Sequence, residues 1–84
     1  MSTADEIMHA LQQTGTGVGQ GIAAANGAKG KTEQAIAQAT ALGSRDKIAE
    51  YNALKAAIEE AITALNGGQE KVVQALNRAR AAAG

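Results

Sequence analysis

The sequence predicts an all-α protein, built as an antiparallel helix–turn–helix hairpin. Three observations lead to this fold class. Ala supplies 21 of the 84 residues and Pro is absent, a composition that favours long helices. The larger apolar residues recur every three or four positions, and no segment alternates apolar and polar residues as a strand does. A helix stop signal and a helix start signal adjoin near the middle of the chain, at Gly43 and Ser44.

The first helix is predicted over residues 4–41. Thr3 and Glu6 form a capping box, in which each side chain satisfies a free backbone amide of the first turn. The large apolar residues that follow share one helical face: Ile7, Leu11, Val18, Ile22, Ile36 and Leu42. Small residues fill the positions between them on that face: Gly15, Ala25, Ala28, Thr32, Ala35 and Ala39. This face is the one expected to pack against the second helix.

A cluster of four glycines, Gly15, Gly17, Gly19 and Gly21, interrupts the first helix in composition. Four glycines inside a helix cost about 4 kcal/mol relative to Ala. Two structures are compatible with the cluster. The helix continues and its small residues let the neighbouring backbone approach closely, or the helix breaks here. In both cases this level of the hairpin is predicted to be its softest.

The turn is predicted over residues 42–45, with Gly43 ending the first helix and Ser44 capping the second. The second helix is predicted over residues 46–82. Its apolar residues again step by three or four: Ile48, Tyr51, Leu54, Ile58, Ile62 and Leu65, then Val72, Val73 and Leu76. The sequence Asn66-Gly67-Gly68 between the two groups is a predicted weak point.

Folding the chain about this turn pairs residues whose numbers add up to about 87. Leu11 then faces Leu76, Ile22 faces Leu65 and Ile36 faces Tyr51. The two arms have equal length, about 55 Å each at 1.5 Å per residue. The glycine cluster of the first arm also meets the glycines near residue 67. The agreement favours a hairpin joined by a short turn.

The chain has few large side chains for a core, only 16 after Met1, and a single aromatic residue, Tyr51. A chain of this size forms a marginal core on its own. The apolar stripe is wider than one seam, which favours pairing with a second hairpin into a four-helix bundle. The alternative is a stripe that serves the single hairpin alone. The predicted seam and partner-facing residues are Leu11, Val18, Ile22, Ile36, Ile48, Tyr51, Leu54, Ile58, Ile62, Leu65, Val72 and Leu76.

The sequence offers no catalytic, cofactor or metal site, so we expect no enzyme. Cys is absent, and the one His, His9, has no carboxylate four residues after it to share a metal. Glu59 and Glu60 are neighbours in a helix and therefore point about 100° apart, too far to share a proton. Eight basic residues balance eight acidic ones, which removes the electrostatic drive for binding nucleic acid.

The segment from Ala25 to Thr32 reads Ala-Asn-Gly-Ala-Lys-Gly-Lys-Thr. It matches the least stringent form of the phosphate-binding loop motif, with Ala25 in place of the first Gly. That loop requires a preceding buried strand, a following helix and an acidic residue that holds magnesium. The preceding Ile22, Ala23 and Ala24 belong to the predicted helix, and no strand ending in Asp is present. We therefore interpret the segment as a polar stretch of helix surface.

In length, hairpin symmetry, lack of Cys and richness in Ala, Gly and Gln, the whole chain resembles the WXG superfamily. These are small helical hairpins, similar to early secreted antigens, that are associated with type VII secretion. The family places Trp-x-Gly in the turn; here the turn reads Ala41-Leu42-Gly43, which keeps the Gly and lacks the Trp. The family's export signal, a Tyr followed four residues later by an acid, is absent, because Tyr51 is followed by Lys55. The chain looks closest to actinobacterial relatives without the Trp.

The expected function is a protein–protein interaction module. The resemblance implies a secretion-associated protein that pairs with itself or a related hairpin, as a small substrate or as partner of a larger secreted effector. The alternative is a structural subunit that polymerises into a filament or needle. The first six residues carry two acids and no Lys or Arg, and the chain has no long apolar run, so we expect neither a signal peptide nor membrane insertion. The expected location is the cytoplasm, with export only by a route independent of a signal peptide.

Overall fold

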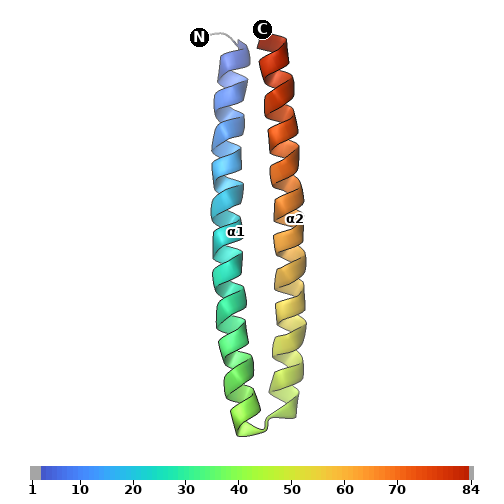
Figure 1. Ribbon diagram of the computed structural model, residues 1–84. Helices are drawn as coiled ribbons and strands as arrows, with labels where there is room; N and C mark the ends of the chain where they lie inside the picture. Colours follow the sequence, from blue (N-terminus) through green and yellow to red (C-terminus); the bar gives the residue numbers. More distant parts are fainter. Residues whose placement is uncertain (1–2, 84) are drawn as a thin grey trace.

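The computed structural model describes residues 3–83, which form two long helices and a short turn. Helix α1 spans Thr3–Leu42 and helix α2 spans Arg45–Ala83. The helices run antiparallel and side by side over their whole length, with both ends of the chain at one end of the rod (Figure 1). The Cα atoms extend over 62 × 16 × 11 Å. The predicted fold class, an all-α antiparallel hairpin, is confirmed.

The two helices meet along a seam that follows a strict heptad spacing of three and four residues. Every residue at these positions is buried or half-buried. The seam positions of α1 are Ala4, Met8, Leu11, Gly15, Val18, Ile22, Ala25, Lys29, Thr32, Ile36 and Ala39. Those of α2 are Ile48, Tyr51, Lys55, Ile58, Ile62, Leu65, Gln69, Val72, Leu76 and Ala79. This spacing is typical of a coiled coil, in which such residues interlock across the seam.

Contacts between the helices establish their register. A Cβ placed on Gly15 would lie 3.4 Å from Cγ1 of Val72, and one on Gly21 would lie 3.8 Å from both Cδ atoms of Leu65. These pairs have residue numbers that add up to about 87, the value expected from folding the chain at its midpoint. The same register, applied along the whole seam, places a small residue of α1 opposite a larger residue of α2 at several positions.

Helix α1 runs without a break through its glycine cluster, so the continuous helix is the alternative that the structure shows. Gly15 packs against Val72, and its lack of a side chain allows the two helices to approach closely there. Gly17 has no such contact, since a Cβ on it would meet nothing within 4 Å. Helix α2 also continues through residues 66–68, where the sequence predicted a weak point. Packing along the seam compensates for the poor helix propensity of these glycines.

Three backbone hydrogen bonds form the turn. Gly43 N donates to Thr40 O at 3.1 Å, and Ser44 N donates to Ala39 O at 3.0 Å. This pair of bonds is the Schellman motif that ends many helices. Ile48 N then donates to Ser44 O at 3.0 Å and starts α2. Gly43 has a φ of +69°, a left-handed conformation that other residues adopt at a cost.

Replacing Gly43 with Ala should therefore lower the free energy of unfolding by about 1 kcal/mol. The cost is conformational, because a Cβ at this position would meet no atom within 4 Å. Gly43→Asn should cost less, since Asn tolerates the left-handed region better. Urea unfolding followed by circular dichroism measures both variants. Equal stability of the Ala variant and the natural chain would contradict the role assigned to this residue.

Four residues predicted on the packed face of α1 lie beside the seam instead. Ile7 is 50% exposed and directly precedes the seam residue Met8, and Ala35 directly precedes the seam residue Ile36. Leu42 is 84% exposed, because it lies in the last turn, one residue short of the next seam position. Ala28 is exposed, and its neighbour Lys29 occupies the seam position instead. The sequence pattern favoured Ala28 because an apolar residue was expected there, whereas the heptad spacing selects the Lys.

Candidate interaction surface

The seam is thin, and it leaves most side chains partly open to water. Among the described residues no side chain is fully buried. The most buried residues are Ala39, Thr32 and Val72, with 5%, 7% and 9% of their surface exposed. A two-helix rod can cover only one stripe of each helix, so half-burial is what its geometry allows.

The structure brings together most of the residues predicted to interact. Eleven of the twelve lie on the seam, buried or half-buried: Leu11, Val18, Ile22, Ile36, Ile48, Tyr51, Ile58, Ile62, Leu65, Val72 and Leu76. Leu54 does not, since it is 49% exposed and lies beside the seam. It belongs to an exposed group of large apolar residues that also contains Ile7, Leu42 and Val73.

Three polar seam residues, Lys29, Lys55 and Gln69, were not identified from the sequence. A search for apolar periodicity passes over them. Their signal is the spacing itself, because each falls three or four residues from its seam neighbours on both sides. Long side chains at such positions bury their stems and keep the polar end near water. Single polar seam residues also fix register at a cost in stability.

Gln69 links the two helices through the glycine cluster. Its Nε2 donates a hydrogen bond of 3.1 Å to the backbone carbonyl of Gly15. Its Oε1 is buried and, among the described residues, has no hydrogen-bond partner. A buried acceptor without a partner costs about 1–3 kcal/mol. Gln69 therefore fixes the register at this level while weakening the packing around it.

Replacing Gln69 with Leu should stabilise the hairpin by about 1 kcal/mol. The change removes the unpaired Oε1 and adds apolar contact, which together outweigh one hydrogen bond. The thermal midpoint, measured by circular dichroism, should rise by several degrees. The control is Gln74→Leu on the exposed surface of the same helix, which should change the midpoint little. A lower midpoint for the Gln69 variant would mean that the hydrogen bond to Gly15 dominates.

An ion pair joins the helices in the half of the rod nearer the turn. Lys55 Nζ lies 3.8 Å from Glu33 Oε2, with side-chain exposures of 31% and 51%. A pair this exposed is worth less than about 1 kcal/mol. The ion pair shows that the side chain of Lys55 leaves the seam on the side where Glu33 lies. It contributes little to the stability of the hairpin.

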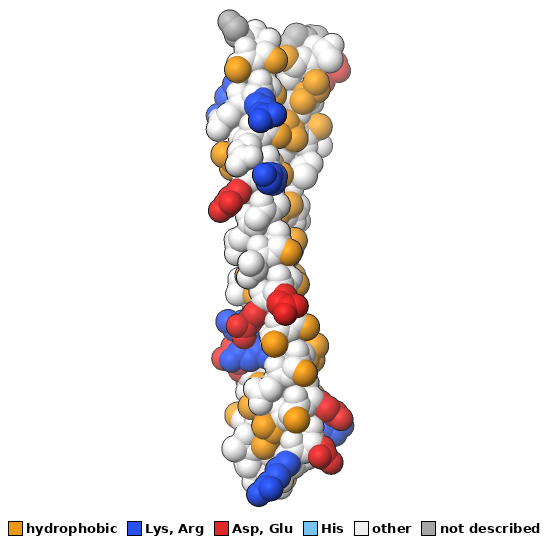
Figure 2. Space-filling view, turned by 90° about the vertical axis from the view of Figure 1, so that its right-hand side faces the viewer, with side chains coloured by type: hydrophobic (Ala, Val, Ile, Leu, Met, Phe, Trp, Pro, Cys, Tyr) orange, Lys and Arg blue, Asp and Glu red, His pale blue; other side chains and the backbone are white. Residues whose placement is uncertain are grey.

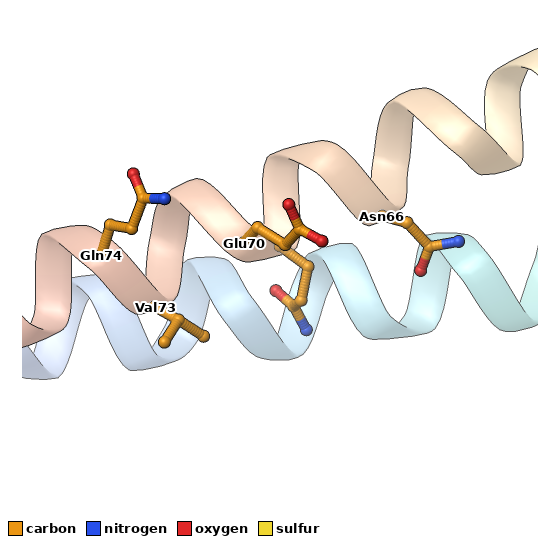
Figure 3. A pocket seen from close by; sticks show the side chains of 5 residues that line it. Asn66, Glu70, Val73 and Gln74 are labelled. Carbon is orange, nitrogen blue, oxygen red and sulfur yellow. The ribbon is translucent and has the colours of Figure 1, made fainter.

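One surface hollow is lined by Asn66, Gln69, Glu70, Val73 and Gln74, all of them on α2. Figure 3 shows the labelled side chains projecting from the helix in different directions, without a common point where a ligand would be held. An active site needs convergent groups in a partly enclosed cavity.

The segment that resembles a phosphate-binding loop lies wholly inside α1. Its backbone amides are used in helical hydrogen bonds, so they cannot form the cradle that such a loop presents to phosphate. In residues 3–83 no group of three His, Asp or Glu side chains is placed to hold a metal ion. None of the helices in that range has a stretch long and apolar enough to cross a membrane.

Comparisons with models of protein families, with curated proteins and with solved structures found no match to this chain.

Proposed function

We propose that this chain is a non-enzymatic interaction module: a helical hairpin that pairs with itself or with a related hairpin. One observation carries the proposal. The accessible surface is 5817 Å² for a mass of 8.4 kDa. A compact monomer of that mass has about 4,600 Å². The hairpin thus exposes about 1,200 Å² more than a compact fold, an area typical of one side of a substantial protein–protein contact.

The thin seam supports the same function. Only two apolar residues among those described are buried, Ala39 and Val72, with 5% and 9% of their surface exposed, and polar residues occupy several seam positions. Such a seam supplies little net stability to a chain of 84 residues. A partner that covers the rest of the apolar surface stabilises the folded state by mass action. Folding and binding are therefore coupled in this protein.

The coupling is tested on the isolated chain. At micromolar concentration the chain should show reduced helicity at 222 nm, or a midpoint below about 45 °C, at the low end for small domains. Both values should rise when the concentration is increased or a related hairpin is added. A chain that is fully helical, monomeric and highly stable at micromolar concentration would contradict the proposal, because it needs no partner.

Sedimentation velocity distinguishes two forms of self-association. A single discrete species supports a module that pairs once. Continued growth with concentration supports the alternative function, a subunit of a filament or needle. No observation in the structure favours open-ended growth.

The secretion role is the finer part of the proposal and is supported by resemblance alone. A chain of this kind would act in type VII secretion as a small substrate or as partner of a larger effector. A tagged chain, expressed in a bacterium with such a system, should reach the medium only when the secretion ATPase is intact. Because the chain lacks the family's Tyr-based signal, export should also require a partner that carries it. Retention under all these conditions would contradict the secretion role and leave the interaction role standing.

A further inference from the structure

The two flanks of the seam differ sharply in composition. One flank, here called the apolar flank, consists of the residues that immediately precede alternate seam positions. Its residues are Ile7, Thr14, Gly21, Ala28, Ala35 and Leu42 of α1, and Lys47, Leu54, Ala61, Gly68, Ala75 and Ala82 of α2. The opposite, polar flank consists of Asp5, Gln12, Gly19, Asn26, Glu33 and Thr40 of α1, and Asn52, Glu59, Asn66, Val73 and Arg80 of α2.

The structure shows that each flank is shared by both helices. Ala35 and Leu42 of α1 line a surface hollow together with Lys47 of α2, on the apolar flank. On the polar flank, Gln12 and Gly19 of α1 line another hollow together with Val73 of α2. Figure 2 shows hydrophobic side chains following one edge of the rod for most of its length.

Exposed apolar bulk concentrates on the apolar flank. Ile7, Leu42 and Leu54 are 50%, 84% and 49% exposed, and all three belong to it. Val73, at 52%, is the large apolar residue exposed on the polar flank. The apolar flank carries a single charge, that of Lys47, whereas the polar flank carries four, those of Asp5, Glu33, Glu59 and Arg80. The apolar flank is thus more than a row of small residues, since it also exposes large side chains that water solvates poorly.

We propose that the apolar flank is the interface for a second copy of this chain, which packs on it to form a four-helix bundle. The inference rests on the interaction function proposed above and names its surface and its partner. The face is long enough, because the rod extends over 62 × 16 Å and a stable contact needs about 800 Å² from each partner. The excess surface of about 1,200 Å² per chain exceeds that requirement.

A second copy fits this flank in charge and in shape. A strongly charged partner would find almost no opposite charge here, whereas a second apolar flank requires none. The centre of the flank is small, with Gly21, Ala28, Ala61 and Gly68, and allows close helix approach. Ile7 lies toward the chain ends, and Leu54 toward the turn. A two-fold axis across the centre therefore brings the Ile7 end of one copy onto the Leu54 end of the other, with the two hairpins antiparallel.

A pair of matched Glu substitutions tests the surface. Ala61→Glu places a charge at the centre of the apolar flank, and Ala53→Glu places the same charge on the outer face of the same helix; both residues are exposed in the hairpin. The natural chain should sediment as a dimer. Ala61→Glu should weaken dimerisation at least tenfold, and Ala53→Glu less than threefold. Dimerisation of the Ala61 variant as tight as that of the natural chain would overturn the inference.

Cysteine cross-linking gives a second readout that does not depend on loss of stability. The chain contains no Cys, so a single introduced thiol reports contact between copies. With a flexible bis-maleimide reagent Ala61→Cys should form a cross-linked dimer, because the two-fold axis places the two thiols within about 10 Å of each other along the rod, and Ala53→Cys should not. If Ala61→Glu loses its helicity as well, this result decides: an absent or equal cross-link for the two variants overturns the proposed surface.

The experiments distinguish a failure of the proposed dimer interface from a failure of the proposed interaction function. A natural chain that stays monomeric at every concentration overturns pairing of two copies. The interaction function then still stands if the isolated monomer is marginally folded and a related hairpin stabilises it. It fails together with the surface only if that monomer is independently stable.

Discussion

Replacing Val72 with Asp should unfold the hairpin, and the same replacement at Val73 should not. Val72 is 9% exposed and contacts the glycine cluster, with Cγ1 at 3.4 Å from a Cβ placed on Gly15. A carboxylate there loses its hydration, and burying a charge in this way costs more than about 3 kcal/mol. Small domains seldom exceed 3–5 kcal/mol of core stabilisation, so most of the population should lose its helicity.

Val73 supplies the matched control, since it is the same residue type one position later and is 52% exposed. Asp at this position remains hydrated on the polar flank and should change the free energy of unfolding by about 0.5 kcal/mol, as most surface substitutions do. Ellipticity at 222 nm and thermal midpoints compare the variants at equal concentration. Similar midpoints for the two Asp variants would contradict the seam described here, because they differ only in the burial of the carboxylate.

The large apolar residues and the turn made the hairpin predictable from sequence. Ile22, Leu65 and their neighbours repeat at helical spacing, and Gly43 and Ser44 stop one helix and start the next. Because the turn lies at the midpoint, chain geometry alone then sets the register. The contact between Gly15 and Val72 agrees with that register. These features are local in the chain, so they can be recognised before any tertiary contact is known.

The polar part of the seam was less accessible to sequence reasoning. Lys29 and Lys55 occupy positions where an apolar residue was expected. Whether a Lys can lie at a seam depends on how close its end comes to water, and the narrowness of this rod makes that easy. The difference between the flanks was hidden for a related reason. Residues such as Ala61 and Glu59 can be assigned to a flank only when the packing of the two helices is known, because each flank contains residues from both helices.

The glycines explain how so few large side chains hold the rod together. At Gly15 and Gly21 the absence of a side chain lets Val72 and Leu65 pack against the backbone of α1. Bulk from α2 thus fills the space that small residues of α1 leave open. Five other helical glycines have no such role in the single hairpin, because a Cβ on any of them would meet no atom within 4 Å: Gly17, Gly27, Gly30, Gly67 and Gly68. They carry the cost of backbone entropy without a packing gain.

Replacing Gly27, Gly30 and Gly67 together with Ala should therefore stabilise the hairpin strongly. Each is exposed in a helix interior, and a Cβ on any of the three would meet no atom within 4 Å. Each replacement adds about 0.8–1.0 kcal/mol of helix propensity, or about 2.5–3 kcal/mol for the triple variant if the sites act independently. The thermal midpoint should rise by about 10 °C or more.

The seam and the turn provide the contrasting sites for this prediction. Ala at Gly43 should destabilise the chain, because that residue has a φ of +69°. A side chain larger than Ala at Gly15 should also destabilise it, because a Cβ there already lies 3.4 Å from Val72. None of the three glycines chosen for replacement belongs to the apolar flank, so dimer formation should survive in the triple variant. A triple variant no more stable than the natural chain would mean that these glycines pack against a surface absent from the isolated hairpin, and that a partner covers the outer faces of the rod as well as its flank.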